Sequence, residues 1–147
     1  MTKDIKKESN KEKVMGNNSN NDNNKEDRSL AAILIRGKIH FRHDVKETLQ
    51  RLNLIRKNNC VILPDTLIVN GMLEKVKDAI TWGTVSQETI SKVSAKRAVK
   101  RDKVKFKSYA LSPPRGGFDR KGIKKSYPVG GALGKRNNMD ELLSRMV

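Results

Sequence analysis

The chain has little of several residue types on which secreted, membrane and redox proteins depend. Its 147 residues include one cysteine, two histidines and four prolines, and aromatic side chains make up only 4%. The single cysteine, Cys60, excludes an internal disulfide, and within Cys-Val-Ile-Leu we expect it to be a buried thiol acting as a small hydrophobe. No apolar run approaches the roughly 18 residues of a membrane-spanning helix. Residues 1–9 are charged throughout and lack the apolar stretch of a secretion signal, so we expect the protein to stay in the cytoplasm, where it is made.

Patterns that support catalysis are also missing. The stretch 130–136 resembles a phosphate-binding loop, but that motif requires Gly at Val129 and Ser or Thr at Arg136. His40 and His43 have no nearby Cys or carboxylate pair with which to form a metal site. The acidic residues are scattered among lysines, and no acid/base pair or Ser/His/Asp group can be nominated. We therefore expect no enzyme activity, metal, cofactor or small-molecule substrate.

Positive charge is abundant and unevenly distributed. The chain has 32 Lys and Arg against 16 Asp and Glu, a net charge of +16 and a pI near 10.2. Between residues 92 and 147 there are 16 basic and 4 acidic residues, which leaves 12 of the 16 net charges in the last third. Nucleic acid is the commonest partner of such a region. An anionic membrane surface is the rival, and the shortness of the amphipathic stretches disfavours it.

Composition divides the chain into three regions. Residues 1–28 mix seven basic, six acidic and seven Asn residues with few apolar ones, and we expect a disordered, solvated tail. Residues 29–91 have a regular hydrophobic pattern and form the predicted folded core. Residues 92–147 form the predicted basic extension.

The core pattern predicts alternating strands and helices. The expected strands are short apolar runs, and the expected helices have apolar residues at helical spacing. In chain order these are strand 31–36, helix 43–54, strand 60–63, helix 71–80 introduced by Asn70-Gly71, and strand 82–85. This order predicts a small α/β sandwich of β-α-β-α-β type with both helices on one sheet face and a right-handed crossover in its first β-α-β unit. A domain of this size is marginal alone, so we expect a partner to help hold it.

Two helices are expected in the extension. One begins near Ser86 and places Lys92, Lys96 and Lys100 on one face, either as a binding stripe for an anion or as a solvated face. The other covers 138–147, with Asn138 as candidate cap, and its apolar edge is expected to dock on the core or on a neighbouring protein.

Between these helices, residues 112–136 combine cations with glycines and prolines, as expected of a segment that moulds itself to a polyanion. Glycines let backbones approach closely, and the prolines limit the conformations lost on ordering. Tyr109, Phe118 and Tyr127 offer faces either for an unstacked base or for packing on the core.

These residues resemble a known family. The resemblance lies in Arg36-Gly37-Lys38, residues 52–66 (LNLIRKNNCVILPDT), residues 71–83 (GMLEKVKDAITWG) and residues 113–136, in order and with the expected spacing. Together they resemble the large-subunit ribosomal proteins numbered thirty in the universal scheme, in their archaeal type, which is related to eukaryotic large-subunit protein seven. The Asn-rich residues 1–28 depart from that pattern.

The resemblance implies a ferredoxin-like sheet with two helices, assembly into the large ribosomal subunit beside other subunit proteins, and contact with large-subunit rRNA near the 5S rRNA, itself a candidate partner. The rRNA contacts that it implies lie in the core turns and in the glycine-rich segment: Arg36, Lys38, Arg56, Lys57, Asn58, Asn59, Arg115, Arg120, Lys121, Lys124, Lys125, Lys135 and Arg136.

We therefore predict a structural constituent of the cytoplasmic ribosome that binds rRNA and supports subunit assembly and translation. In this prediction the α/β core is a rigid mount, and the basic C-terminal half folds onto rRNA. The alternative is an RNA-binding or RNA-chaperone module outside the ribosome. A nucleotide-dependent enzyme is disfavoured because the phosphate-loop motif fails.

Overall fold

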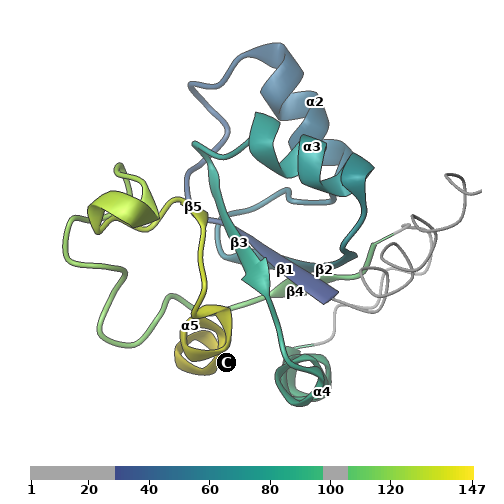
Figure 1. The fold of residues 1–147 in the computed structure, drawn as a ribbon, viewed down its shortest axis with the longest axis vertical. Coiled ribbons are helices and arrows are strands. Elements are labelled where there is room, and N and C mark those ends of the chain that lie inside the picture. The colour runs from purple at the N-terminus through teal and green to yellow at the C-terminus, as the bar shows by residue number, and fades with distance from the viewer. Residues whose placement is uncertain (1–28, 98–105) are drawn as a thin grey trace, which may run out of the picture.

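The chain folds into a mixed α/β structure, as predicted. The computed structural model describes residues 29–97 and 106–147 (Figure 1). The predicted tail at 1–28 and Lys100 of the predicted stripe lie outside the described residues. Along the chain the elements are β1 (Ser29–Leu34), α2 (His43–Arg51), β2 (Asn59–Pro64), α3 (Leu67–Lys75), β3 (Ile80–Thr84), α4 (Gln87–Arg97), β4 (Ser108–Ala110), the 3-10 helix η1 (Tyr127–Val129), β5 (Gly134–Lys135) and α5 (Met139–Met146).

The five strands form one sheet in the order β4-β2-β1-β3-β5. Strand β1 is antiparallel to both of its neighbours, with Ile33 opposite Cys60 of β2 and Thr81 of β3. The predicted crossover in the first β-α-β unit is therefore wrong, because the connection through α2 leaves and re-enters the sheet at the same end. Strands β2 and β3 lie on either side of β1, are joined through α3 and run in the same direction. The strands that pair in parallel are β3 and β5. Element order alone does not specify which strands pair.

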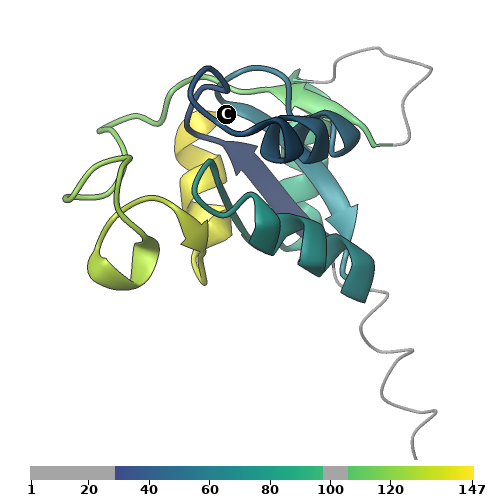
Figure 2. The same ribbon diagram turned by 90° about the horizontal axis from the view of Figure 1, so that it is seen from above.

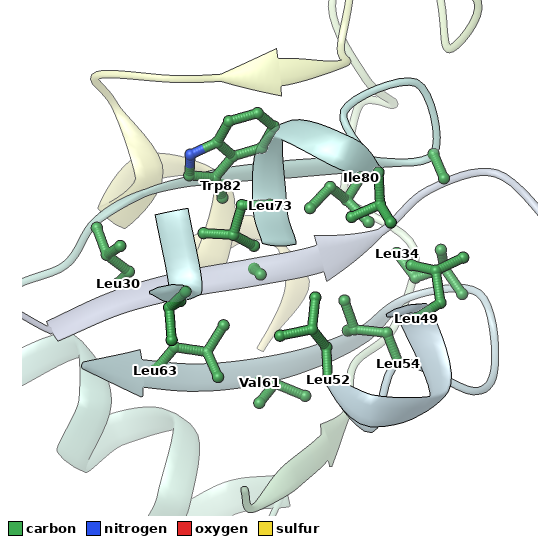
Figure 3. Close-up of a cluster of buried hydrophobic side chains, with 14 residues drawn as sticks. Leu30, Leu34, Leu49, Leu52, Leu54, Val61, Leu63, Leu73, Ile80 and Trp82 are labelled. Carbon is green, nitrogen blue, oxygen red and sulfur yellow. The ribbon is translucent and has the colours of Figure 1, made fainter. Parts of the chain in front are cut away.

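One face of the sheet packs against α2 and α3, as predicted (Figure 1). Alternate residues of β1 point to this face, as the two-residue period of a strand requires. They meet leucines from both helices and the indole of Trp82, which is 4% exposed (Figure 3). The labelled members of this cluster are Leu30, Leu34, Leu49, Leu52, Leu54, Val61, Leu63, Leu73, Ile80 and Trp82.

The second face is covered by α4 and α5, which lie on the opposite side of the sheet from α2 and α3 in Figure 1. Ala31 and Ile33 of β1 point to this face, and both are fully buried. Helix α5 contributes Met139, Leu142, Leu143 and Met146, each at most 1% exposed. The apolar edge of the last helix thus docks on the core, one of the two predicted alternatives. Both faces of the sheet are thus covered by helices of the same chain.

Helix α3 begins earlier than predicted. Thr66 occupies the N-cap, and its hydroxyl oxygen accepts a hydrogen bond from the Val69 backbone N–H (3.3 Å). Asn70 and Gly71, which were expected to introduce the helix, lie inside it. The missed signal was the threonine two residues after Pro64, since threonine is a favoured N-cap residue.

Candidate nucleic-acid interface

Three segments that are far apart in sequence meet at one end of the sheet, where β1 finishes and β2, β3 and β5 begin. They are residues 35–38, residues 56–58 and the glycine-rich loop of residues 112–136. The backbone N–H of Asn58 donates to Leu34 O (2.7 Å), and that of Leu111 donates to Asn58 O (3.1 Å). We call this region the basic end, because most of the cations predicted to bind rRNA lie here. Figure 2 shows the glycine-rich loop, in green to yellow-green, projecting beyond the sheet.

The turn after β1 is held against the start of β3. The backbone N–H groups of Ile35 and Arg36 both donate to Ala79 O at 3.0 Å. The Arg36 guanidinium donates to Asp78 O (3.2 Å) and lies 5.2 Å from the centre of the Phe41 ring. These contacts hold the partly exposed guanidinium in place on this turn.

Lys38 and Lys57 come from the two turns at this end of the sheet. Lys38 is partly buried, and desolvation lowers the pKa of its ammonium group. Lys57 crosses the other turn at Gly37, where a Cβ would lie 3.0 Å from Lys57 Cε. The predicted contact residues of these two turns therefore lie close together.

Asn58 joins the two turns through its backbone. Its φ of 62° is left-handed, a conformation that asparagine tolerates better than most residues. Its neighbours Arg56 and Lys57 are exposed, whereas the Asn59 amide is directed to Ser108 Oγ (3.3 Å). Asn58 therefore shapes the turn that presents the two cations.

The glycine-rich loop packs against β1 and carries most of the exposed cations of the basic end. Its apolar residues Phe118, Ala132 and Leu133 pack on Ile35, just beyond the end of β1. Within the described part of the chain, none of its six exposed cations has an acidic partner within 4.0 Å. These six are Arg115, Arg120, Lys121, Lys124, Lys125 and Lys135.

Arg136, in contrast, lies in the interior. Its side chain is 3% exposed, forms an ion pair with Asp119 and stacks 4.8 Å from the centre of the Tyr127 ring. Its backbone N–H donates to Trp82 O (2.8 Å). Arg136 therefore differs from the other cations predicted for this loop, because its charge already has an acidic partner and is shielded from solvent. Asp119 is the only acidic residue between 112 and 136, and that isolated position was the one sequence signal for the pair.

Helix α4 brings a second group of cations to the edge of the basic end. Lys92 and Lys96 are exposed on it, and Val93 anchors the helix in the second-face core. At its C-terminal end Arg97 donates to Ser112 Oγ (2.9 Å), where the glycine-rich loop begins. The described part of the predicted lysine stripe therefore runs toward the loop.

The aromatic side chains of the extension are used in packing. Tyr109 is 6% exposed in the second-face core, and its burial, with Cys60 beside it, raises the pKa of its hydroxyl. Phe118 is partly buried between two clusters, and Tyr127 has its ring against Arg136. Of the two predicted alternatives, the structure supports packing for all three residues.

The described residues contain no group of three His, Cys, Asp or Glu side chains placed to hold a metal ion. Among residues 29–97 and 106–147, no helix combines the length and apolar character needed to cross a membrane. The exposed charged residues of the basic end are cations, and in the described part of the chain none of them has an acidic partner within 4.0 Å.

Comparison with known proteins points in one direction. Residues 30–80 match the family model described as ribosomal protein L30p/L7e. The chain is 32% identical over 153 residues to the large ribosomal subunit protein uL30 of Methanococcus maripaludis, covering 81% of this chain and 99% of that protein. The protein of the same name from Methanopyrus kandleri is 34% identical, over 77% of this chain and 100% of its own length. That of Nanoarchaeum equitans is 31% identical, over 80% and 97%.

Proposed function

Because the chain belongs to the ribosomal protein L30p/L7e family and is thus a protein of the large ribosomal subunit, we propose that its basic end binds large-subunit rRNA. The protein is structural rather than an enzyme. The observation that supports the proposal is the set of six exposed loop cations that have no acidic partner among the described residues. They lie beside the two turns that carry Arg36, Lys38, Arg56 and Lys57.

Binding at such a surface is driven by phosphate contacts. Each lysine or arginine that neutralises a phosphate releases condensed counterions, so affinity falls as salt rises. The loop also leaves room for RNA beside the backbone of Gly116, whose φ is 79° and where a Cβ would meet nothing within 4 Å. A tight turn without side chains allows a phosphate to reach backbone N–H groups.

The cations of α4 extend this surface in the proposal. Lys92 and Lys96 lie on the helix whose last residue, Arg97, reaches Ser112 at the start of the loop. An RNA strand that follows the loop could therefore continue along α4. We include Lys92 and Lys96 in the binding surface on that ground, and Arg136 is left out because it is paired with Asp119.

Two finer elements rest on the family resemblance. We propose that the protein lies near the 5S rRNA in the cytoplasmic ribosome, beside other large-subunit proteins. We also propose that it supports assembly of the subunit. In support of these roles, one end of the domain carries exposed cations that have no acidic partner among the described residues. Helix α5, in contrast, packs on its own sheet.

Sucrose-gradient sedimentation of cell extract tests the proposal. The full chain, tagged at its N-terminus, should sediment with the large subunit and remain there after a high-salt wash. Its absence from washed large subunits would contradict the proposal and favour an RNA-binding role outside the ribosome. A variant with Ala at Lys124, Lys125 and Lys135 should be lost from the subunit at lower salt than the wild type.

A further inference from the structure

The glycine-rich loop is closed by contacts within the chain. The backbone N–H of Tyr127 donates to Leu133 O (2.7 Å), and that of Leu133 donates to Lys125 O (3.1 Å). Gly131 N–H donates to Ser126 O (2.9 Å) in the same turn. The loop thus has a hydrogen-bonded structure of its own, made by contacts within the chain.

Close packing at Gly131 reinforces this closure. A Cβ on Gly131 would lie 2.1 Å from Lys125 O and 2.4 Å from the Lys125 carbonyl carbon, a separation that no side chain tolerates. The two arms of the loop therefore touch backbone to backbone. This contact fixes the backbone position of Lys125, which is one of the exposed cations.

The side chains of Asp119, Tyr127 and Arg136 lock the base of the loop. Arg136 is the last residue of the loop and is fixed to β3 by its backbone hydrogen bond to Trp82 O (2.8 Å). Asp119 lies in the first third of the loop, and Tyr127 lies in the 3-10 helix η1. Their contacts tie the middle and both ends of the loop to the sheet. A buried guanidinium whose carboxylate is removed is left with an uncompensated charge, so each partner strongly holds the other.

We infer that the Asp119–Arg136 pair, packed on Tyr127, is a clasp that sets the loop in its RNA-binding shape before RNA arrives. This inference rests on the proposed function and revises the sequence-based expectation of a segment that folds onto rRNA. Arg136 then acts as a positioning residue, while the exposed lysines make the phosphate contacts. Ordering the loop in advance removes part of the entropy cost of binding.

The negative charge of Asp119 allows a test in which the clasp and simple electrostatics predict opposite changes in affinity for RNA. Asp119→Asn raises the net charge by one, which by electrostatics alone would tighten binding to a polyanion. If the pair is a clasp, the opposite holds: affinity for purified large-subunit rRNA should fall roughly tenfold because the loop must be ordered on binding. Glu141→Gln, at an exposed position of α5, makes the same charge change outside the loop and should bind as tightly as wild type or more tightly.

Two readouts on the full chain separate positioning from phosphate contact. Arg136→Met should weaken binding at every salt concentration without changing the slope of log K against log salt. Loss of a phosphate ligand would instead lower that slope by about 0.7 to 0.9. Hydrogen exchange without RNA should speed up at the amides of Gly131, Ala132 and Leu133 in both clasp variants, and stay unchanged in Glu141→Gln. Trp82 fluorescence reports whether the core remains folded in each variant; if one of the two clasp variants unfolds, the other carries the test.

Unchanged loop exchange in Asp119→Asn, or rRNA affinity equal to that of Glu141→Gln, would overturn the clasp. A lower salt slope in a folded Arg136→Met would also overturn it, because Arg136 would then be a phosphate ligand. If wild-type protein binds rRNA no more tightly than it binds heparin, the proposed function fails, and the exchange rates measured without RNA still decide whether the clasp exists.

Discussion

Gly83 of β3 and Arg136 beyond β5 are in backbone contact: a Cβ on Gly83 would lie 2.2 Å from the carbonyl oxygen of Arg136. Gly83 lies opposite Ala31 in the antiparallel pairing of β3 with β1, and Arg136 follows the edge strand β5, which pairs with the other side of β3. Arg136, which locks the loop, therefore packs on β3 at Gly83, where there is no room for a side chain. The stability of the core and the shape of the loop are coupled at this point.

Gly83→Ala should destabilise the fold, because the added methyl group meets backbone that is itself hydrogen-bonded to β3. Overpacking of this kind costs about 1 to 3 kcal/mol, measured as the change in free energy of urea unfolding. Gly71→Ala is the matched control, since a Cβ there meets nothing within 4 Å on helix α3. That control should gain about 0.5 to 1 kcal/mol. Equal stabilities of the two variants would contradict the close approach.

Replacing the exposed Lys124, Lys125 and Lys135 together with Ala should weaken rRNA binding and reduce its salt dependence. The slope of log K against log salt should drop by about 2 to 3 if each lysine contacts one phosphate. Arg51→Ala is the control, because Arg51 is on α2 and is already paired with Glu47 (2.7 Å). Filter binding across a KCl series measures both slopes. A triple-variant slope equal to that of wild type would place the binding surface elsewhere.

Leu142→Ala should test the contribution of α5. Leu142 is fully buried between α5 and the sheet, so removing its side chain leaves a cavity and should cost about 2 to 5 kcal/mol in the free energy of unfolding. Ser144→Ala, on the exposed side of the same helix, should change stability by less than about 0.5 kcal/mol. If the two variants unfold at the same urea concentration, α5 does not contribute to the core.

Cys60 should be unreactive in the folded protein. Burial raises the pKa of its thiol to about 12, so the thiolate is scarce at pH 8 and the sulfur is fully covered. A disulfide reagent at pH 8 should label it only as fast as the protein unfolds, and immediately in urea. Rapid labelling of the native protein would show that the second-face core opens.

The raised pKa of the Cys60 thiol also makes the free energy of unfolding depend on pH. The folded-state pKa lies above that of the unfolded chain, so the contribution of the buried neutral thiol is complete below about pH 8.5. It is lost as pH rises toward 12, where the thiol ionises even in the folded state. As the pH rises from about 9 to about 11, the free energy of unfolding of Cys60→Ala should therefore fall less than that of the wild type.

The sequence-based predictions were most successful where the deciding signal is local. The apolar run that forms β1 and the helical spacing of α2 follow from the residues themselves. The starts of α4 after Ser86 and of α5 after Asn138 were also predicted, although the Asn138 side chain makes no capping hydrogen bond. The α3 prediction failed because two start signals competed, and the Thr66 cap prevailed over the Asn70-Gly71 turn. Local propensity was insufficient there because a half-buried asparagine, which donates to Asp65 Oδ1 (2.7 Å), and an exposed glycine are tolerated inside a helix that is anchored elsewhere.

The sequence by itself determined the α/β class, the concentration of charge in the last third and the family to which the chain belongs, since these depend on composition, periodicity and motif order. Only the tertiary structure decided that β1 pairs antiparallel on both sides, that α5 covers the sheet and that Arg136 is buried against Asp119 while its neighbour Lys135 is exposed. The reason is physical: each of these outcomes is set by contacts between residues distant along the chain, such as Trp82 with Arg136. The identity of a lysine or arginine gives no sign of whether an acidic partner will be folded against it.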